Sequence, residues 1–324
     1  MRFIVIFLCL ISSPNFAFAQ RTYLTGNTTF LVSSSGEDSV PCGNASSPCL
    51  TKQGAWNAAL LVDAMNFTVT ISDPACSDEA PLAATSPIIG AQQPIYVTGN
   101  VSSPCAVTNT TGGDAFRFDG PIKISLSGFN PSSSGGLGGS GVHASRGAEV
   151  DYGAGIILGA AGSGRSFADA ARIVYTAPYT IGPGSSAEVD HVINGGVIAA
   201  DSQNVTCQSG AEITSYWLGN GGGWASYTGP VTFTNCTNVN TQYFVHLNGA
   251  TKLAGTVLPG ATGSSINGNV DDVITGLQVG VNGSIWMGSG QTADSATQLQ
   301  FNGTNFYITP PGSGKAYIKG GIDY

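Results

Sequence analysis

The sequence predicts an all-β fold in which the chain winds into a stack of β-coils, a β-solenoid. A four-residue phrase returns at Ala148–Asp151, Ala187–Asp190 and Ala211–Thr214, with a degenerate copy at Ala250–Leu253. Recurrence of this kind is typical of solenoids, whose coils bury their apolar faces by stacking. The 46 glycines disfavour long helices and suit tight corners. At about 20 to 25 residues per coil, the interval from Ala187 to Ala211 corresponds to one coil. The interval from Ala148 to Ala187 and that from Ala211 to Ala250 each correspond to two slightly short coils.

The first 19 residues have the pattern of a signal peptide. Arg2 precedes an apolar run from Phe3 to Ile11, and the small-residue box Ala17-Phe18-Ala19 precedes Gln20. The run is shorter than the roughly 20 apolar residues that a membrane anchor needs, and no later segment is expected to span a bilayer. We therefore expect export, with a mature secreted or cell-surface chain that begins near Gln20.

The composition argues against nucleic acid as a partner. Eleven Lys and Arg residues are scattered along a chain with a net charge of −8, whereas phosphate binding needs clustered basic residues. Only 9% of the residues are charged, so the surface is expected to be a neutral polar layer of Ser, Thr, Asn and Gly. Such a surface suits either carbohydrate binding or persistence outside the cell, and composition does not separate the two.

Six cysteines remain after removal of the signal peptide, and an even number in an exported chain indicates disulfides. Six cysteines permit about fifteen pairings. Proximity favours Cys42 with Cys49, Cys76 with Cys105, and Cys207 with Cys236. Metal ligation is the weaker interpretation, because no Cys-x-x-Cys or Cys-plus-His spacing occurs.

The segment from Phe30 to Leu61 reads as a strand, a Ser35-Gly36-Glu37-Asp38 turn, a Ser47-Pro48-x-x-Thr51 segment and a short amphipathic helix. It resembles the beginning of many pectate-lyase-like right-handed parallel β-helix proteins. The resemblance implies a single-stranded right-handed parallel β-helix whose open end is covered by the helix. Cys42 and Cys49 depart from that pattern and would bridge the capping loop. The residues expected to face the interior lie at helical spacing: Ala55, Ala58, Ala59 and Val62.

We divide the mature chain into three parts. Residues 20–65 form the first strand and the capping helix, and residues 66–268 form the β-helix, with alternating strands from Phe67 onward. Residues 269–324 form a small C-terminal β module with a hairpin at Asn302-Gly303. This module resembles the tail-fibre-type endings of phage and prophage proteins, which implies self-association, for example as a homotrimer.

The carboxylates of the repeated phrase are the candidate catalytic residues: Glu149, Asp151, Glu188, Asp190 and Glu212. Residues i and i+2 of a strand share a face, and stacked coils lie about 4.8 Å apart. Glu188 and Glu212 would then be about 5 Å apart, as in retaining glycosidases, and their crowding would raise one pKa. Two alternatives are a solvated outer face and a calcium site; no other cofactor is expected.

His143, His191 and His246 occupy similar places relative to the phrase. No Ser or Cys lies in a nucleophile-elbow context, so we interpret the histidines as turn or surface residues. Arg146 and Arg172 could serve as a base, as arginine does in pectate lyases, but the calcium-binding aspartate pattern of that family has no counterpart here. The resemblance therefore carries over the fold and none of the family's catalytic residues.

The best candidate for ligand binding is a group of aromatic residues around Gly219–Gly223: Tyr216, Trp217, Trp224 and Tyr227. Aromatic faces on a glycine loop stack on sugar rings, although the same residues could cover a coil corner. The sequence thus favours a non-catalytic β-helix that binds extracellular or cell-surface polysaccharide, such as an adhesin or a tail-spike-like receptor binder. The alternative is a polysaccharide lyase or glycoside hydrolase that uses stacked carboxylates.

Overall fold

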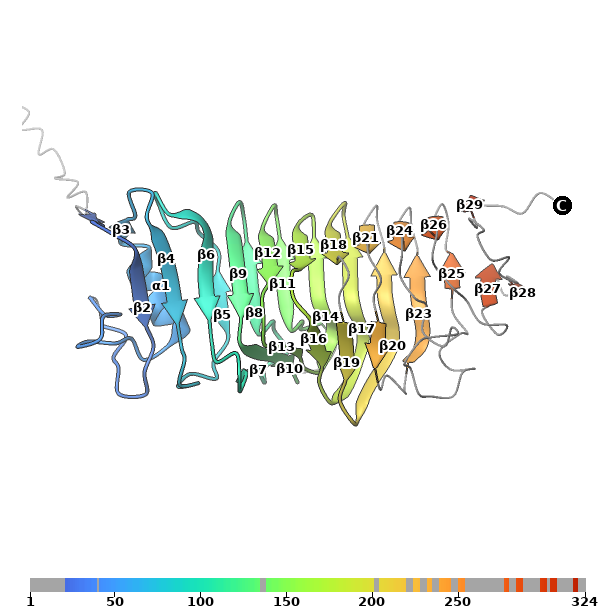
Figure 1. Ribbon diagram of the computed structural model, residues 1–324, viewed down its shortest axis with the longest axis horizontal. Coiled ribbons are helices and arrows are strands. Elements are labelled where there is room, and N and C mark those ends of the chain that lie inside the picture. The colour runs from blue at the N-terminus through green and yellow to red at the C-terminus, as the bar shows by residue number, and fades with distance from the viewer. Residues whose placement is uncertain are drawn as a thin grey trace, which may run out of the picture.

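The computed structural model describes residues 21–39, 41–134, 138–200 and 204–219 and, beyond them, the strands β21 to β29; side chains are described as far as Glu212. The strands stack as successive rungs along one long axis (Figure 1). Neighbouring rungs pair in parallel from β2 to β25, which confirms the predicted β-solenoid. The signal peptide predicted at residues 1–19 lies outside the described residues.

The solenoid has three sides, two of which are long sheets. The eleven-stranded sheet contains, in order, β2 (Thr28–Leu31), β4 (Thr68–Ser72), β6 (Gln92–Thr98), β9 (Lys123–Ser127), β12 (Glu149–Tyr152), β15 (Arg172–Tyr175), β18 (Val197–Ala200), β21 (Trp224–Tyr227), β24 (Ala250–Leu253), β26 (Ser284–Met287) and β29 (Tyr317–Lys319). The ten-stranded sheet contains β5 (Leu82–Ala84), β8 (Phe116–Asp119), β11 (Val142–Ser145), β14 (Ala161–Asp169), β17 (Gly184–Ile193), β20 (Ala211–Gly219), β23 (Val239–Val245), β25 (Leu277–Val279), β27 (Gln298–Phe301) and β28 (Thr304–Tyr307).

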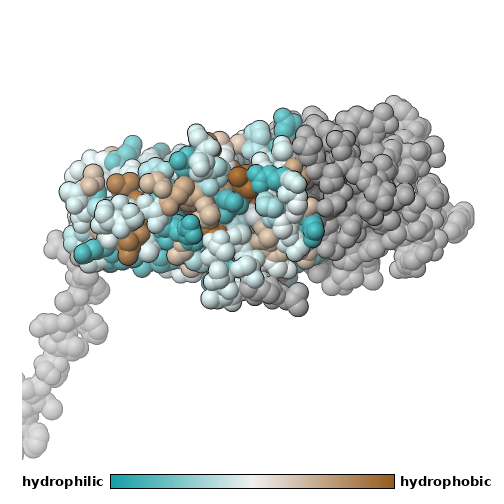
Figure 2. Space-filling model, turned by 90° about the horizontal axis from the view of Figure 1, so that it is seen from below, coloured by the Kyte–Doolittle hydropathy of each residue, from teal (hydrophilic) through white to brown (hydrophobic). Residues whose placement is uncertain are grey.

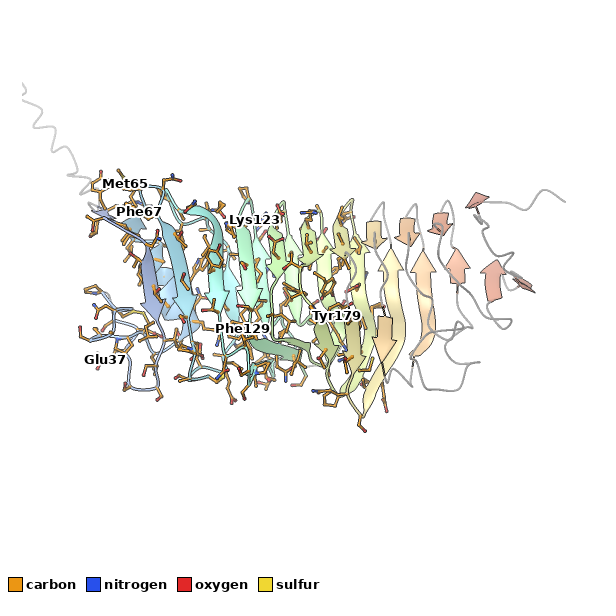
Figure 3. The ribbon with its side chains drawn as sticks, viewed as in Figure 1. Glu37, Met65, Phe67, Lys123, Phe129 and Tyr179 are labelled. Atoms are coloured by element: carbon orange, nitrogen blue, oxygen red, sulfur yellow. A yellow bond between two sulfur atoms is a disulfide. The ribbon has the colours of Figure 1, made fainter. Side chains whose placement is uncertain are left out.

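The third side consists of the pair β7 (Cys105–Asn109) and β10 (Phe129–Ser133), followed by β13 (Ile156–Leu158), β16 (Tyr179–Ile181), β19 (Asn204–Cys207) and β22 (Thr232–Thr234). Phe129 and Tyr179 lie on this side, in the lower part of Figure 3, whereas Lys123, the first residue of β9, lies above them. A separate parallel pair joins β1 (Thr22–Tyr23) to β3 (Val62–Asp63).

The register shows how the coils line up. Glu149 pairs with Lys123 of the preceding coil and with Arg172 of the following one. For two copies of the repeated phrase to stack, Ala187 would have to pair with Ala211. Instead Gly184 pairs with Ala211, so this coil is longer than the interval between the copies. The phrase therefore recurs out of step with the coils, and the prediction that its copies stack on one another is wrong.

The interior is filled by alternate side chains of each strand. In β4, for example, Val69 and Ile71 are buried between half-buried threonines and a serine. Phe116, Phe118 and Phe129 pack against one another inside the solenoid. Tyr152, Tyr175 and Tyr179 form a second aromatic group in the rungs that follow. The predicted polar skin and apolar interior follow from this period-two burial.

A charged residue, Arg165, also lies inside the solenoid and is fully buried. Its guanidinium donates hydrogen bonds to the Leu158, Gly182 and Gly184 carbonyls at 2.6 to 2.7 Å and to Ser186 Oγ at 2.9 Å. These acceptors come from successive rungs and from the corners between sheets. The charge of the buried guanidinium is thus met by backbone carbonyls and a hydroxyl, and the Leu158 carbonyl accepts the Gly182 amide as well.

The N-terminal end is covered as the sequence predicted. Helix α1 (Lys52–Ala59) begins after the N-cap residue Thr51, whose side chain accepts a hydrogen bond from the Gly54 amide at 2.9 Å. Ala55, Ala58 and Ala59 are buried against β2, β4 and β5, while Val62 belongs to β3 and is half-buried. α1, the one helix of the described residues, is far shorter than a bilayer crossing requires.

The free edge of β2 is occupied by the loop that contains the first disulfide, Cys42–Cys49. The Leu31 amide donates to the Gly43 carbonyl at 2.6 Å, and the Cys49 amide donates to the Leu31 carbonyl at 2.9 Å. Val32 and Cys49 form an isolated parallel bridge. The predicted bridge of the capping loop is confirmed, and the loop pairs with the end of this sheet edge, at Leu31 and Val32.

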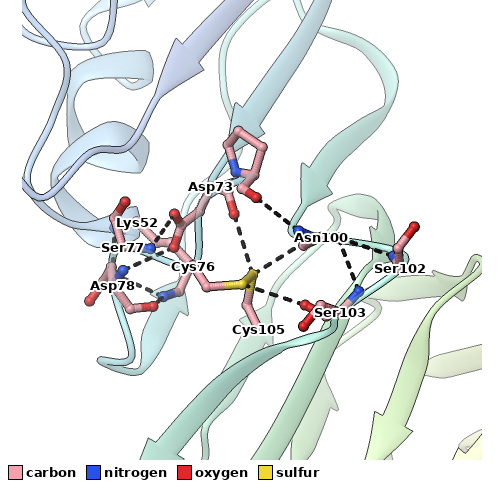
Figure 4. The surroundings of a disulfide bond; sticks show 10 residues. Lys52, Asp73, Cys76, Ser77, Asp78, Asn100, Ser102, Ser103 and Cys105 are labelled. Atoms are coloured by element: carbon pink, nitrogen blue, oxygen red, sulfur yellow. Dashed lines mark hydrogen bonds and ion pairs between the residues drawn. A yellow bond between two sulfur atoms is a disulfide. The ribbon is translucent and has the colours of Figure 1, made fainter.

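The second predicted bridge, Cys76–Cys105, is also present and ties the segment after β4 to the start of β7 (Figure 4). The Asp73 carboxylate accepts the Ser77 and Asp78 amides at 2.7 and 3.0 Å beside it. The two disulfides indicate an oxidising compartment. Cys207 is buried, and its predicted partner Cys236 lies outside the described residues.

Near the C-terminus, β27 and β28 pair antiparallel around the predicted hairpin, with Phe301 opposite Thr304. Asn302 and Gly303 themselves lie outside the described residues. β26 and β29 also pair antiparallel, and these strands continue the two long sheets. The division at residue 269 and the separate module remain predictions.

Candidate functional site

The predicted catalytic carboxylates do not form one ladder. Glu149 lies on β12 in the eleven-stranded sheet, and Glu188 lies on β17 in the ten-stranded sheet. Glu188 pairs in register with Ser215, whereas Glu212 pairs with Ser185, so the two carboxylates are three positions out of register. The predicted close pair of Glu188 and Glu212 is therefore wrong, because the intervening coil is longer than the interval between the two copies of the phrase.

Glu149 and Asp151 take part in ion pairs on the outside of the eleven-stranded sheet. Glu149 contacts Lys123 at 2.9 Å and Arg172 at 2.8 Å, and Asp151 lies 3.4 Å from Lys123. The hydrogen bond from Lys123 is the main reason that the pKa of Glu149 is lowered. A carboxyl held ionised in this way is unsuited to donate a proton as a general acid.

Arg172 and Arg146, the residues weighed as a lyase base, are likewise paired. Arg172 binds Glu149, and Arg146 binds Asp119 through two hydrogen bonds at a corner of the solenoid.

Asp190 lies inside the solenoid and is fully buried, not beside Glu188 on an outer face. It accepts a hydrogen bond from the Tyr175 hydroxyl, which lies 2.8 Å from Ser166 Oγ; that oxygen is 3.0 Å from the Tyr152 hydroxyl. Burial raises the pKa of Tyr175 well above its ordinary value. This chain of hydroxyls satisfies a buried carboxylate and stabilises the interior.

Glu188 is the one predicted carboxylate in a chemically unusual place. Its side chain is only 16% exposed on the outside of the ten-stranded sheet, and burial raises its pKa to about 7. Glu188 Oε2 lies 3.6 Å from His191 Nδ1, and Ser163 Oγ lies 3.4 Å from the same nitrogen. A protonated Glu188 beside a neutral imidazole is a potential general acid near neutral pH.

Burial also lowers the pKa of His191 to about 4, with a smaller contribution from the charge of His143. Because Ser163 and Glu188 approach the same ring nitrogen, the three residues do not form a catalytic triad, in which nucleophile and carboxylate occupy opposite nitrogens.

His191 belongs to a line of side chains that crosses β11, β14 and β17. Arg117, His143, Phe167 and His191 occupy successive positions of one register line. The Phe167 ring lies 4.6 Å from the His143 ring and 4.6 Å from the His191 ring. We call His143, Phe167 and His191 the ring row; their strand neighbours, such as Ala144 and Ala168, are buried, so the row faces outward.

The ring row ends in a second carboxylate–imidazole pair. Asp114 Oδ2 lies 2.9 Å from His143 Nδ1, and Asp114 Oδ1 accepts the Ser140 amide at 2.9 Å. His143 Nε2 is buried and has no hydrogen-bond partner among the described residues. The row thus places one carboxyl–imidazole pair on each side of Phe167.

The structure places the predicted aromatic binding residues by their backbone alone. Tyr216 and Trp217 lie on β20, and Trp224 and Tyr227 lie on β21, in different sheets; their side chains are outside the described residues, as is His246. Within the part of the chain that the structure describes, no group of three or more His, Cys, Asp or Glu residues is arranged to hold a metal ion. The calcium alternative remains untested for the rest of the chain.

The described part of the face shown in Figure 2 is weakly polar. Figure 2 shows pale residues over most of the described face, with only small strongly hydrophilic or hydrophobic areas.

Comparisons of the chain with protein-family models, with curated proteins and with solved structures found no match.

The sequence indicated that His143 and His191 occupy similar places but did not predict the ring row, because the repeated phrase is out of step with the coils. The signal was present: Arg117, His143, Phe167 and His191 recur once per coil, at the spacing that the register gives. Asp114 and Ser163 carry no such signal, because they are not on the register line of the ring row. They contact His143 and His191 only because of how the chain folds.

Proposed function

We propose that this protein is a secreted β-solenoid that binds extracellular or cell-surface polysaccharide along the outside of the ten-stranded sheet. The observation that carries this proposal is the ring row with its flanking polar groups. Carboxyl, imidazole and hydroxyl groups hydrogen-bond sugar hydroxyls, and the apolar edge of Phe167 lies between them. The two disulfides and the low content of charged residues, 9% of the chain, are consistent with a role outside the cell.

The proposal includes the finer features of the fold. Crossovers between parallel strands of one sheet are right-handed in about 98% of cases, which supports a right-handed parallel β-helix, as does the resemblance of residues 30–61 to pectate-lyase-like proteins. Association as a homotrimer through residues 269–324 is part of the same adhesin or tail-spike-like proposal.

A pull-down with insoluble or immobilised polysaccharides of bacterial and plant origin tests the binding proposal. Phe167→Ala is expected to reduce retention on the polysaccharide that wild type binds. Val174→Ala is the matched control, because Val174 is a half-buried outward residue of β15 in the other long sheet. Equal retention of both variants would place the binding site elsewhere on the molecule.

Cleavage of the bound polysaccharide is a second candidate function, favoured by the raised pKa of Glu188. A carboxyl that is half-protonated near pH 7 can protonate a leaving oxygen. Glu188→Gln is expected to abolish the formation of new reducing ends and to keep retention. Glu212→Gln, which changes an exposed carboxylate in another register position, is expected to leave cleavage intact. Cleavage by Glu188→Gln at the wild-type rate would exclude this role.

A further inference from the structure

We propose that the buried side chains of Lys52 and Asp78 join covalently, through an amide between Lys52 Nζ and Asp78 Cγ. This isopeptide bond ties helix α1 to the segment between β4 and β5, and so fixes the capping helix to the solenoid. It is a modification inside the N-terminal end of the molecule, and it does not depend on what the ring row binds or cleaves.

Lys52 and Asp78 are placed within reach of each other. Lys52 is the first residue of α1, and Asp78 lies 26 residues further along the chain. Lys52 Nζ lies 3.0 Å from Asp78 Oδ2 and also donates to the Asp78 main-chain carbonyl (Figure 4). Because Cγ is one carbon–oxygen bond of about 1.2 Å from Oδ2, Nζ lies within about 4.2 Å of the carbon that it attacks. A small displacement therefore brings the two atoms into bonding range.

Both groups are also removed from water. The Lys52 side chain is fully buried, and the Asp78 side chain is 6% exposed. Burial lowers the pKa of Lys52, although the charge of Asp78 opposes this effect. A buried ammonium gives up its proton more readily than an exposed one, and the neutral amine is a nucleophile. The same burial keeps water from hydrolysing the amide once it has formed.

The charges of the pair favour its conversion into an amide. A buried ion pair has lost the hydration of both ions, and their mutual attraction offsets that loss only in part. Amide formation between Lys52 and Asp78 removes both buried charges at once. The product is a neutral group, which is far less costly to bury than two ions.

Two main-chain amides face the carboxyl carbon that is attacked. The Lys52 amide donates to Asp78 Oδ2 at 2.7 Å, and the Ala80 amide donates to Asp78 Oδ1 at 2.8 Å. When Nζ attacks, negative charge collects on the oxygen that stays, and a fixed N–H group stabilises that charge. The Ala80 amide serves Oδ1 in this way. It remains bonded to the same oxygen in the product, so the new carbonyl is not left unsatisfied.

The loop that presents Asp78 is held in place before any reaction. The Asp73 carboxylate accepts the Ser77 and Asp78 amides at 2.7 and 3.0 Å. The disulfide Cys76–Cys105 anchors the same loop to the start of β7 (Figure 4). A nucleophile and a carboxyl that are fixed against each other react without the entropic cost of a bimolecular encounter.

The reaction needs no co-reactant. One proton of the Lys52 ammonium passes to Asp78 Oδ2, which gives a neutral amine and a neutral carboxyl. The Nζ lone pair then forms the bond to Cγ, and a second proton of Nζ passes to Oδ2. The bond from Cγ to Oδ2 breaks, and Oδ2 leaves as water with its electron pair and both protons. The amide keeps the third proton of Nζ, so atoms and charges balance.

Mass spectrometry of the full mature chain tests the proposal. The folded protein is denatured, reduced and alkylated, so that no disulfide joins its parts. We expect a mass one water molecule below that of the sequence. Digestion with a protease that cuts before aspartate is expected to leave residues 38–62 and 73–113 joined, with no cut before Asp78.

Three variants identify the linked atoms. Lys52→Met removes the nucleophile, and we expect the full mass and separate peptides. Asp78→Asn is expected to form the same amide with loss of ammonia in place of water, which identifies Cγ as the carbon attacked. Lys123→Met is the matched control, because Lys123 forms an ion pair of similar length, 2.9 Å to Glu149, but is 36% exposed. This variant is expected to keep the mass deficit of wild type.

The wild-type measurement decides by itself, so a variant that fails to fold does not weaken the test. Full mass in wild type, with residues 38–62 and 73–113 released separately, would overturn the proposal and leave Lys52 and Asp78 as a permanent ion pair. A loss of water that persists in Lys52→Met would place the modification at other residues, and it would overturn the proposal as well.

Discussion

Asp190 illustrates how one side chain departs from a strand pattern. The rule that residues i and i+2 share a face placed Asp190 beside Glu188 on the outside. In β17 both Val189 and Asp190 are buried, so the alternation is interrupted, and the neighbouring register of β14 shifts between Ala161 and Gly164. An irregularity of this kind depends on backbone contacts between rungs and leaves no mark in the sequence.

The buried hydroxyl chain gives a matched prediction at the residue level. Tyr175→Phe removes the hydrogen bond to the Asp190 carboxylate together with the contact with Ser166, whereas Tyr152→Phe removes only a hydrogen bond with the neutral Ser166. Bonds to charged groups contribute about 1.5 to 3 kcal/mol and neutral ones about 0.5 to 1.5 kcal/mol. We expect Tyr175→Phe to lower the free energy of unfolding more than Tyr152→Phe. Denaturant titration checks this, and the reverse order would show that the carboxylate does not depend on Tyr175.

Glu188 and His191 make opposite contributions to the pH dependence of stability. With a folded pKa of about 7 and an ordinary value of 4.5, Glu188 keeps a proton in the folded chain that the unfolded chain has lost, so stability falls as pH rises from 4.5 to 7. With a folded pKa of about 4 and an ordinary value of 6.5, His191 stays neutral where the unfolded chain takes up a proton. Its contribution is lost as pH falls from 6.5 to 4.

Glu188→Gln separates these two effects. The variant lacks the cost of ionising a buried carboxyl, so its free energy of unfolding relative to wild type should increase between pH 4.5 and 7 and stay constant above that range. The whole increase should be about 3.5 kcal/mol at most, because the pKa shifts from 4.5 to about 7 and one pKa unit corresponds to about 1.4 kcal/mol. Denaturant midpoints measured at several pH values test this; a difference independent of pH would mean that the Glu188 carboxyl is well solvated.

At the level of the element, the corners between the two long sheets repeat one backbone geometry. Arg146, Ala170 and Asn194 have φ values of 52°, 48° and 52°, in the left-handed region that favours glycine and asparagine. Asn194 also donates to Asp169 at 2.7 Å, which links two successive corners. Ala170 has the same backbone without a compensating side-chain contact among the described residues.

Ala170→Gly is therefore expected to stabilise the protein. Relief of the left-handed strain of an L-residue contributes about 1 to 2 kcal/mol, and the added freedom of glycine in the unfolded chain offsets about 0.4 to 1 kcal/mol of it. The exposed site has no packing to lose. A higher denaturant midpoint is the expected result, and Ala144→Gly, at a buried position with no left-handed backbone, should instead be destabilising. A lower midpoint for Ala170→Gly would refute the strain argument.

The N-terminal disulfide gives a prediction about association. Replacing Cys42 and Cys49 by Ser should loosen the loop that covers the edge of β2 and expose its unpaired backbone groups. We expect concentration-dependent oligomers in sedimentation or light scattering below the unfolding temperature. Replacing Cys76 and Cys105 should cost about 2 to 4 kcal/mol of stability without oligomers, because that bridge lies between rungs. Oligomers from both variants would indicate general unfolding.

At the scale of the whole molecule, the sequence was sufficient for the architecture and for the N-terminal cap. The capping helix was predictable because Thr51 and the alanines of α1 act locally, and two disulfides were predictable because their cysteines are near neighbours. The site was not predictable, because its geometry depends on coil length. A shift of three positions in one coil, as between Glu188 and Glu212, separates groups that the repeated phrase predicted to align.

The covered edge of β2 also gives the stack a direction. A parallel solenoid offers a template for a further rung at each of its two ends, and here the loop held by Cys42–Cys49 pairs with the first strand while α1 packs beside it. Coils can therefore be added only on the side away from the N-terminus. If the capped end folds first, each later coil pairs with a coil that is already folded. A fragment that lacks residues 21–61 would expose the first strand that remains. Both of its ends could then pair with other copies of the fragment, in competition with its own folding.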